Sequence, residues 1–131
     1  MKSYRKFQNI IWTIGFLIFM SYGCFKDIKI PEVTTGTVSD ITSTSAIISD
    51  NTNGDGGGYV SSRGICWSNM LAEPSIKEDN IYYEGHGSGT FSVYIANLTP
   101  GTTYYARAFA TNTEGTGYGP VVTFTTQGSM T

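Results

Sequence analysis

The sequence predicts an all-β domain built as a sandwich of seven short strands. Gly is abundant, with 16 residues, aromatic residues make up 14% of the chain and charged residues 14%. This mixture of strand formers and turn formers favours β-structure over helices. Turn signals recur at a spacing of roughly 8–12 residues, which is typical of a β-sandwich. The stretch 104–111 alternates strictly between two faces and is predicted to be a central strand.

The first 23 residues have the pattern of a secretory signal. Lys2, Arg5 and Lys6 precede the apolar run 10–20, and small residues follow it. An uncleaved membrane anchor and a buried helix are the alternatives, but the run is short for a membrane span, which needs about 20 apolar residues. We therefore expect residues 1–23 to be a signal peptide.

The expected strands follow in order after the leader. They are residues 31–38, 45–49, 59–68, 81–83, 89–95, 104–111 and 120–125. The first, second and fifth should form one sheet, and the third, fourth, sixth and seventh the other. The stretch 50–58 is rich in Gly and Asn and is predicted to be a loop. Residues 69–80 should lie outside the sheets or along an edge, and residues 127–131 should form a short polar tail.

The corner before the sixth strand, residues 98–104, is expected to be held against the core. Leu98 would anchor this corner in the core, and Pro100 would pre-set the dihedral angle of the turn. Small residues then occupy one face of the strand, which are Ala106, Ala108 and Ala110. Something large must fill the space that they leave, and Trp67 with Ile65 on the third strand is the expected filler.

This part of the chain resembles a fibronectin type III domain. The signature of that family is present as Leu98, Pro100, Thr102 and Tyr104, then Ala106, Ala108, Ala110 and Asn112, and then Gly115-Thr116-Gly117. The resemblance covers residues 31–126 and implies a seven-stranded immunoglobulin-like β-sandwich, fibronectin type III-like. It also implies a tyrosine corner, in which the hydroxyl of Tyr104 bonds a backbone group upstream.

The sequence departs from the common family pattern at its tryptophan. The usual core Trp lies on the second strand, which here offers Ala46 and Ile48, whereas Trp67 lies on the third. The segment 63–68 together with the sixth strand is similar to a branch frequent in surface proteins of Bacteroidota. No Arg-Gly-Asp sequence occurs, so the integrin-binding role of some members is not implied.

The end of the leader resembles the lipobox of bacterial lipoproteins. Gly23 precedes Cys24, the residue that would be acylated and become the first of the mature chain, although Ser21 and Tyr22 depart from the usual box. The resemblance implies a lipid anchor at Cys24, a tether over residues 24–30, and an address at the outer membrane or cell surface. The alternative is a soluble exported protein with an incidental Cys.

One face of the sixth strand is the candidate recognition surface. Tyr105, Arg107 and Phe109 alternate outward there, and Gly64 and Cys66 lie on the neighbouring strand. Aromatic rings around a cation could bind sugar rings or a protein partner. The alternative is an ordinary sheet face stabilised by cross-strand pairs.

No constellation for catalysis, cofactors or metals is apparent in the sequence. The chain has one His, and no nucleophile has a base at a defensible spacing. The stretch 51–56 imitates the opening of a calcium loop, but position twelve is Ser62 and position one is a neutral Asn. Removing residues 1–23 takes away three of eight basic residues and none of the 10 acidic ones, so the net charge becomes −5. This balance argues against nucleic-acid binding.

These observations predict a non-catalytic binding or spacer module at the cell envelope. One alternative is an accessory glycan-binding lipoprotein that uses the Tyr105, Arg107 and Phe109 face. Another is the N-terminal part of a larger surface protein or enzyme.

Overall fold

The structure, a computed structural model, describes residues 27–77 and 80–129. The strands in this part of the chain are β1 (Glu32–Ser39), β2 (Ala46–Gly54), β3 (Ser62–Ser68), β4 (Ile81–Gly85), β5 (Gly89–Ile95), β6 (Thr103–Thr111), β7 (Thr116–Tyr118) and β8 (Val122–Thr125). The described residues contain no helix long and apolar enough to span a membrane. The all-β prediction is confirmed, and the signal peptide and Cys24 lie outside the described residues.

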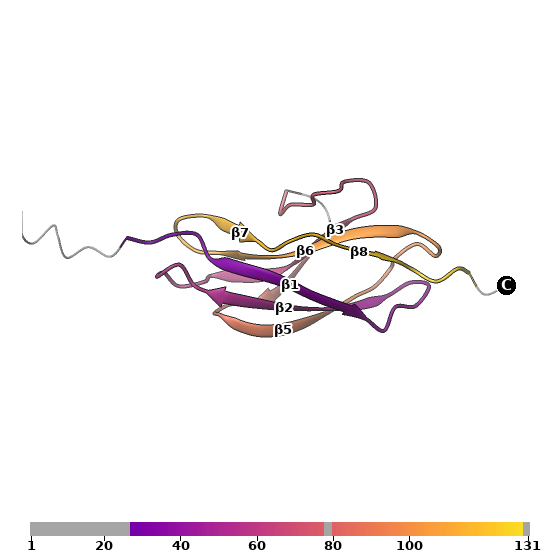
Figure 1. Ribbon diagram of the computed structural model, residues 1–131, viewed down its shortest axis with the longest axis horizontal. Helices are drawn as coiled ribbons and strands as arrows, with labels where there is room; N and C mark the ends of the chain where they lie inside the picture. Colours follow the sequence, from indigo (N-terminus) through magenta and orange to yellow (C-terminus); the bar gives the residue numbers. More distant parts are fainter. Residues whose placement is uncertain (1–26, 78–79, 130–131) are drawn as a thin grey trace, which may run out of the picture.

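Two antiparallel sheets form the sandwich (Figure 1). One has the order β1-β2-β5, and the other the order β4-β3-β6-β7, with β8 also pairing β6. The predicted distribution of strands between the sheets is therefore confirmed. The chain enters at one end of the elongated molecule and leaves at the opposite end.

The predicted last strand, residues 120–125, is present as β8, and an additional short strand, β7, forms before it over residues 116–118, which gives eight strands where seven were expected. β7 pairs with the end of β6 and β8 with its beginning. The break between β7 and β8 falls at Pro120 and Val121. Proline has no N–H to donate to a ladder, so regular pairing is interrupted there.

The prediction of a loop over residues 50–58 was wrong for its first half, because β2 continues to Gly54. Asn51 pairs with Thr34 on one side and Thr90 on the other. Pairing on both sides outweighs the turn preference of Asn and Asp, since strand propensity depends strongly on context.

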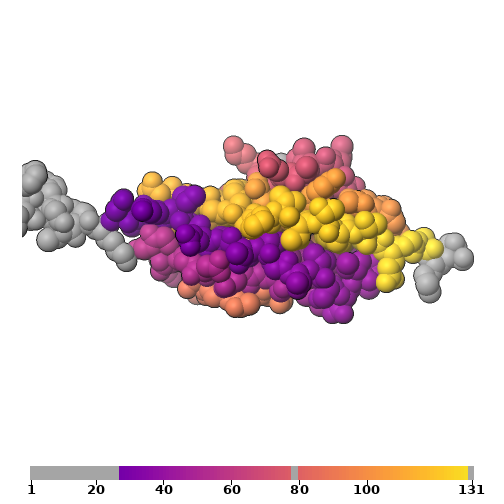
Figure 2. Space-filling view, in the orientation of Figure 1, coloured from indigo at the N-terminus to yellow at the C-terminus, as the bar shows by residue number. Residues whose placement is uncertain are grey.

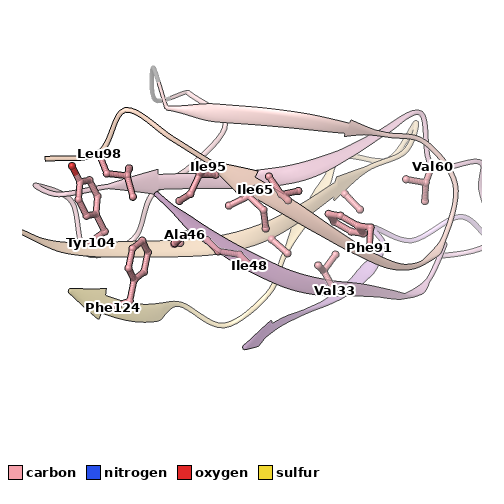
Figure 3. Close-up of a cluster of buried hydrophobic side chains, with 14 residues drawn as sticks. Val33, Ala46, Ile48, Val60, Ile65, Phe91, Ile95, Leu98, Tyr104 and Phe124 are labelled. Atoms are coloured by element: carbon pink, nitrogen blue, oxygen red, sulfur yellow. The ribbon is translucent and has the colours of Figure 1, made fainter. Parts of the chain in front are cut away.

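The core lies between the sheets and runs their full length (Figure 3). Leu98, Tyr104 and Phe124 close one end of it, and Val60 and Val33 lie toward the other. Ile65 is fully buried, as expected for the filler opposite the alanines. Trp67 packs against the cluster but is only partly buried, so it fills the space incompletely.

The predicted tether 24–30 is docked on the domain from Lys29 onward. The Lys29 N–H donates to the Gly56 carbonyl at 2.9 Å, and the Asn112 side-chain amide donates to the Lys29 carbonyl at 2.7 Å. The same amide group donates to the Asp55 carbonyl at 2.9 Å. Asn112 thereby connects the segment at Lys29 to the loop that contains Asp55.

The predicted tail 127–131 is also held at its start. Gln127 accepts from the Gly101 N–H at 2.8 Å, and its own N–H donates to the Thr42 carbonyl at 3.0 Å. Its side-chain amide donates to the Ile41 carbonyl at 2.9 Å. The chain is therefore attached to the corner end of the sandwich as far as Gln127.

Candidate binding surfaces

The predicted recognition face lies on the outer side of β6, but it is not an open surface. Phe109 is fully buried, and Tyr105 and Arg107 are partly buried. The expectation that Phe109 is presented to solvent was therefore wrong. A ligand could reach its ring only if the covering groups moved.

The first covering group is Tyr83 on β4. Gly64 lies between Tyr83 and Phe109 in the register of the sheet. Because glycine has no side chain, the two rings meet above it, with centroids 5.5 Å apart and an edge-to-face angle of 83°. This arrangement is a favourable one for aromatic pairs.

The second covering group is the connection between β3 and β4. Arg107 Nε donates to the Pro74 carbonyl at 2.6 Å, and the Ile76 N–H donates to the Tyr118 hydroxyl at 3.1 Å. The guanidinium also lies 4.1 Å from the centroid of the Tyr118 ring. Figure 2 shows this segment standing on one side of the sandwich. It lies over the outer face, rather than along an edge.

The corner of the sandwich is organised by Tyr104. Its hydroxyl accepts a hydrogen bond from the Thr99 N–H at 2.8 Å. Its ring stacks on Phe124, with centroids 5.7 Å apart. Leu98 is buried beside it, whereas Pro100 is exposed in the turn. The hydroxyl thus closes the corner by bonding five residues upstream.

A pocket of about 440 Å³ opens next to this corner. Its lining includes Trp67, Asn69, Asn80, Asn97, Leu98 and Tyr104. Trp67 comes from β3, the asparagines come from connecting segments, and the last two come from the corner. Sequence reasoning missed this site because the three asparagines are scattered in stretches without a motif. The unusual position of Trp67 on the third strand was the one available signal.

A second pocket, of about 540 Å³, lies at the end where the chain enters. Lys29, Ile30 and Glu32 line it together with Gly117 and Tyr118. The docked N-terminal segment therefore forms one wall of this pocket.

Two buried polar side chains on β2 face the core. Asp50 and Thr52 are 2% and 1% exposed. Asp50 Oδ1 accepts a long hydrogen bond from the Gly36 N–H at 3.4 Å, while Asp50 Oδ2 and Thr52 Oγ1 have no partner among the described residues. Burial raises the pKa of Asp50 to about 7, against a smaller opposing effect of the Gly36 N–H.

The remaining candidates of the sequence form no metal centre in the described part of the chain. No group of three His, Cys, Asp or Glu side chains there could hold an ion. The calcium-like stretch is half strand, and Asp55 Oδ1 accepts from the Gly57 N–H at 2.7 Å. Cys66 is buried, and its thiol donates to the Arg107 carbonyl at 3.6 Å.

Comparison with solved structures decides the fold family. The sixth fibronectin type III domain of human fibronectin type III domain containing protein 3 matches with a TM-score of 0.58 at 24% identity, covering 81% of this chain and 94% of that one. The fold is that of a fibronectin type III domain. The fibronectin type III-like sandwich is also similar to the sensor domain of the anti-sigma factor RsgI4 of Pseudobacteroides cellulosolvens. That match has a TM-score of 0.56 at 20% identity and covers 79% of this chain and 100% of the other.

Neither protein-family models nor curated proteins match the fibronectin type III-like chain. At these identities the structural neighbours establish the fold alone, because one fold hosts many unrelated functions.

Proposed function

We propose that this protein is a non-catalytic binding or spacer module, held at the cell envelope by lipid attached to Cys24. The observation that carries the proposal is the position of the two ends of the domain. The chain enters at Lys29 and leaves beyond Gln127, at opposite ends of the elongated sandwich (Figure 1). An anchor at one end would present the other end away from the membrane.

The contacts of Lys29 with the domain support a defined orientation of the domain relative to the membrane. Lys29 is held by Gly56 and Asn112, and it lies five residues after Cys24 in the sequence. Fully extended, five residues reach about 18 Å. The domain would therefore remain within a short distance of the lipid surface, with its N-terminal end toward the membrane.

The location of the most perturbed carboxyl group supports the non-catalytic part of the proposal. Asp50 lies between the sheets, and it does not line either pocket described above. Its raised pKa follows from burial in the core, where the side chain is 2% exposed. It is accordingly a structural feature rather than a general acid or base.

Metabolic labelling with an alkyne fatty acid in a bacterial host tests the anchor. The wild-type chain should incorporate the label, and Cys24→Ser should abolish it. Cys66→Ala is the matched control, because Cys66 is buried in the sandwich and should leave labelling unchanged. Absence of label in the wild type, or label that survives Cys24→Ser, would refute lipidation.

A further inference from the structure

The pocket at the corner end combines one aromatic side chain with three side-chain amides. Trp67 is partly buried against the core cluster and partly exposed to the pocket. Asn69, Asn80 and Asn97 are exposed around it. No hydrogen bond joins any of the three amide groups to another described residue. They therefore remain available to a ligand.

The backbone around these amides is held in place. The Trp67 N–H donates to the Asn80 carbonyl at 3.1 Å, and the Leu98 N–H donates to the Thr44 carbonyl at 2.9 Å. Asn97 has a left-handed backbone, with φ of 60°, a conformation that Asn tolerates better than most residues. The pocket is thus formed before any ligand arrives.

The chemistry of the lining selects a neutral ligand rich in hydroxyl groups. None of the described residues that line the pocket carries a formal charge, since they comprise amides, Tyr104 and apolar side chains. An Asn amide offers donors and acceptors together, as a hydroxyl group does. A phosphate or carboxylate would find no cation among these described lining residues. The indole ring of Trp67 is suited to packing against a ligand that has one apolar face and one hydrated, polar face.

We propose that this pocket binds one ring of a neutral saccharide, with the ring against Trp67 and its hydroxyl groups bonded to the three amides. The volume of about 440 Å³ lies within the usual range for small-ligand sites, about 300–1,000 Å³. This inference rests on the proposed function and names the ligand class of the binding module. It moves the glycan site from the covered face of β6 to the corner.

The position of the pocket agrees with that role. Leu98 and Tyr104 lie at the end of the core opposite Val60 (Figure 3). The N-terminal segment docks at the Val60 end, where Lys29 meets Gly56 and Asn112. A lipid anchor upstream of Lys29 would therefore leave the corner pocket facing away from the membrane.

Intrinsic fluorescence gives a direct test, because the chain has two tryptophans and Trp12→Phe leaves Trp67 as the reporter. The full chain carrying Trp12→Phe is titrated in a non-glycosidic detergent. The probes are hexasaccharides of β-1,4-glucose, α-1,4-glucose, β-1,4-xylose, β-1,4-mannose and β-1,4-galactose. At least one should change Trp67 emission in a saturable way. Flat emission with all five at millimolar concentration would overturn the proposal.

Variants then locate the site. Asn69→Ala, Asn80→Ala and Asn97→Gly should each weaken binding about threefold to tenfold, as expected for one lost hydrogen bond. Glycine is chosen at position 97 because it accepts the left-handed backbone. Tyr94→Ala, which alters an exposed ring on β5, should leave binding unchanged. Unaltered binding in all three Asn variants would overturn the assignment, as would a stronger response to neutral Gly-Ser-Asn peptides than to the sugars.

The lipid anchor and the saccharide site can each be refuted without affecting the other. Loss of the fatty-acid label in Cys24→Ser should not alter the Trp67 titration. Conversely, a flat titration with normal labelling would leave the anchored module in place and remove its saccharide site.

Discussion

Arg107 Nε donates a hydrogen bond of 2.6 Å to the carbonyl oxygen of Pro74, a residue 33 positions earlier in the chain. This contact joins the central strand β6 to the connection between β3 and β4. One of the three side chains of the predicted recognition face is therefore occupied in holding a covering segment. Arg107 thereby helps to shield the outer face on which Phe109 is buried.

Replacing Arg107 with Met should loosen that segment. The change removes a charge-assisted hydrogen bond and the stacking on Tyr118, so we expect a loss of about 2 kcal/mol in the free energy of unfolding. Denaturant unfolding measures the stability. Hydrogen exchange should become faster at the Ile76 amide, which bonds the Tyr118 hydroxyl. Lys77→Met, at an exposed side chain of the same segment, is the control. Unchanged exchange at Ile76 in the Arg107 variant would contradict this role.

The buried carboxyl group of Asp50 should make the domain less stable at higher pH. The pKa of Asp50 is about 7 in the folded chain, against a reference value of 3.8 for a free aspartate side chain. Between pH 3.8 and pH 7 the folded state therefore binds more protons than the unfolded state. The free energy of unfolding must then decrease as pH rises through this window. We expect a decrease of about 4 kcal/mol between pH 4 and pH 8 from this group.

Denaturant unfolding at several pH values measures this effect against Asp50→Asn. The amide does not titrate, so the variant should lack the Asp50 contribution and keep that of every other group. Arg63 lies over the ring of Phe91, the register neighbour of Asp50, but is paired with Glu84 at 2.8 Å. A wild type and variant with parallel pH profiles would show that Asp50 is ionised normally in the fold.

Two buried threonines should respond in opposite ways to the same substitution. Thr52 Oγ1 has no partner among the described residues, so Thr52→Val removes an unsatisfied hydroxyl and should stabilise the fold by about 1 kcal/mol. Thr126 Oγ1 donates to the Thr99 carbonyl at 2.6 Å and accepts from the Thr102 N–H at 2.9 Å. Thr126→Val should therefore destabilise by about 2 kcal/mol. Thermal and denaturant unfolding of both variants provide the measurement, and a loss of stability in Thr52→Val would indicate a partner for that hydroxyl.

The fold could be predicted from local patterns because its main determinants are local. The alternation in 104–111 placed Tyr104 and the three alanines on the buried face. The division of strands between the sheets, which the resemblance to a fibronectin type III domain implied, agrees with the observed pairing. The additional strand β7 and the extension of β2 to Gly54 could not be predicted in this way. Both depend on which neighbours a strand meets, and polar residues such as Asn51 are paired on both sides.

The candidate site also shows what local sequence patterns can and cannot predict. Strand period alone identified the outer face of Tyr105, Arg107 and Phe109. It could not indicate that a segment without periodicity lies over that face. Likewise, the corner pocket joins Trp67 with Asn69 and Asn80 from the two ends of the β3–β4 connection and with Asn97 from the β5–β6 connection. No spacing in the sequence predicts their meeting.

The sequence by itself determined that this chain forms a β-sandwich with a corner at Tyr104, because strand alternation and turn residues act over short distances. The tertiary structure alone decided which surfaces are open. Phe109 is buried, and Trp67 is left partly exposed beside the asparagines. Exposure depends on the paths of connections that are tied by contacts between distant residues, such as Arg107 and Pro74.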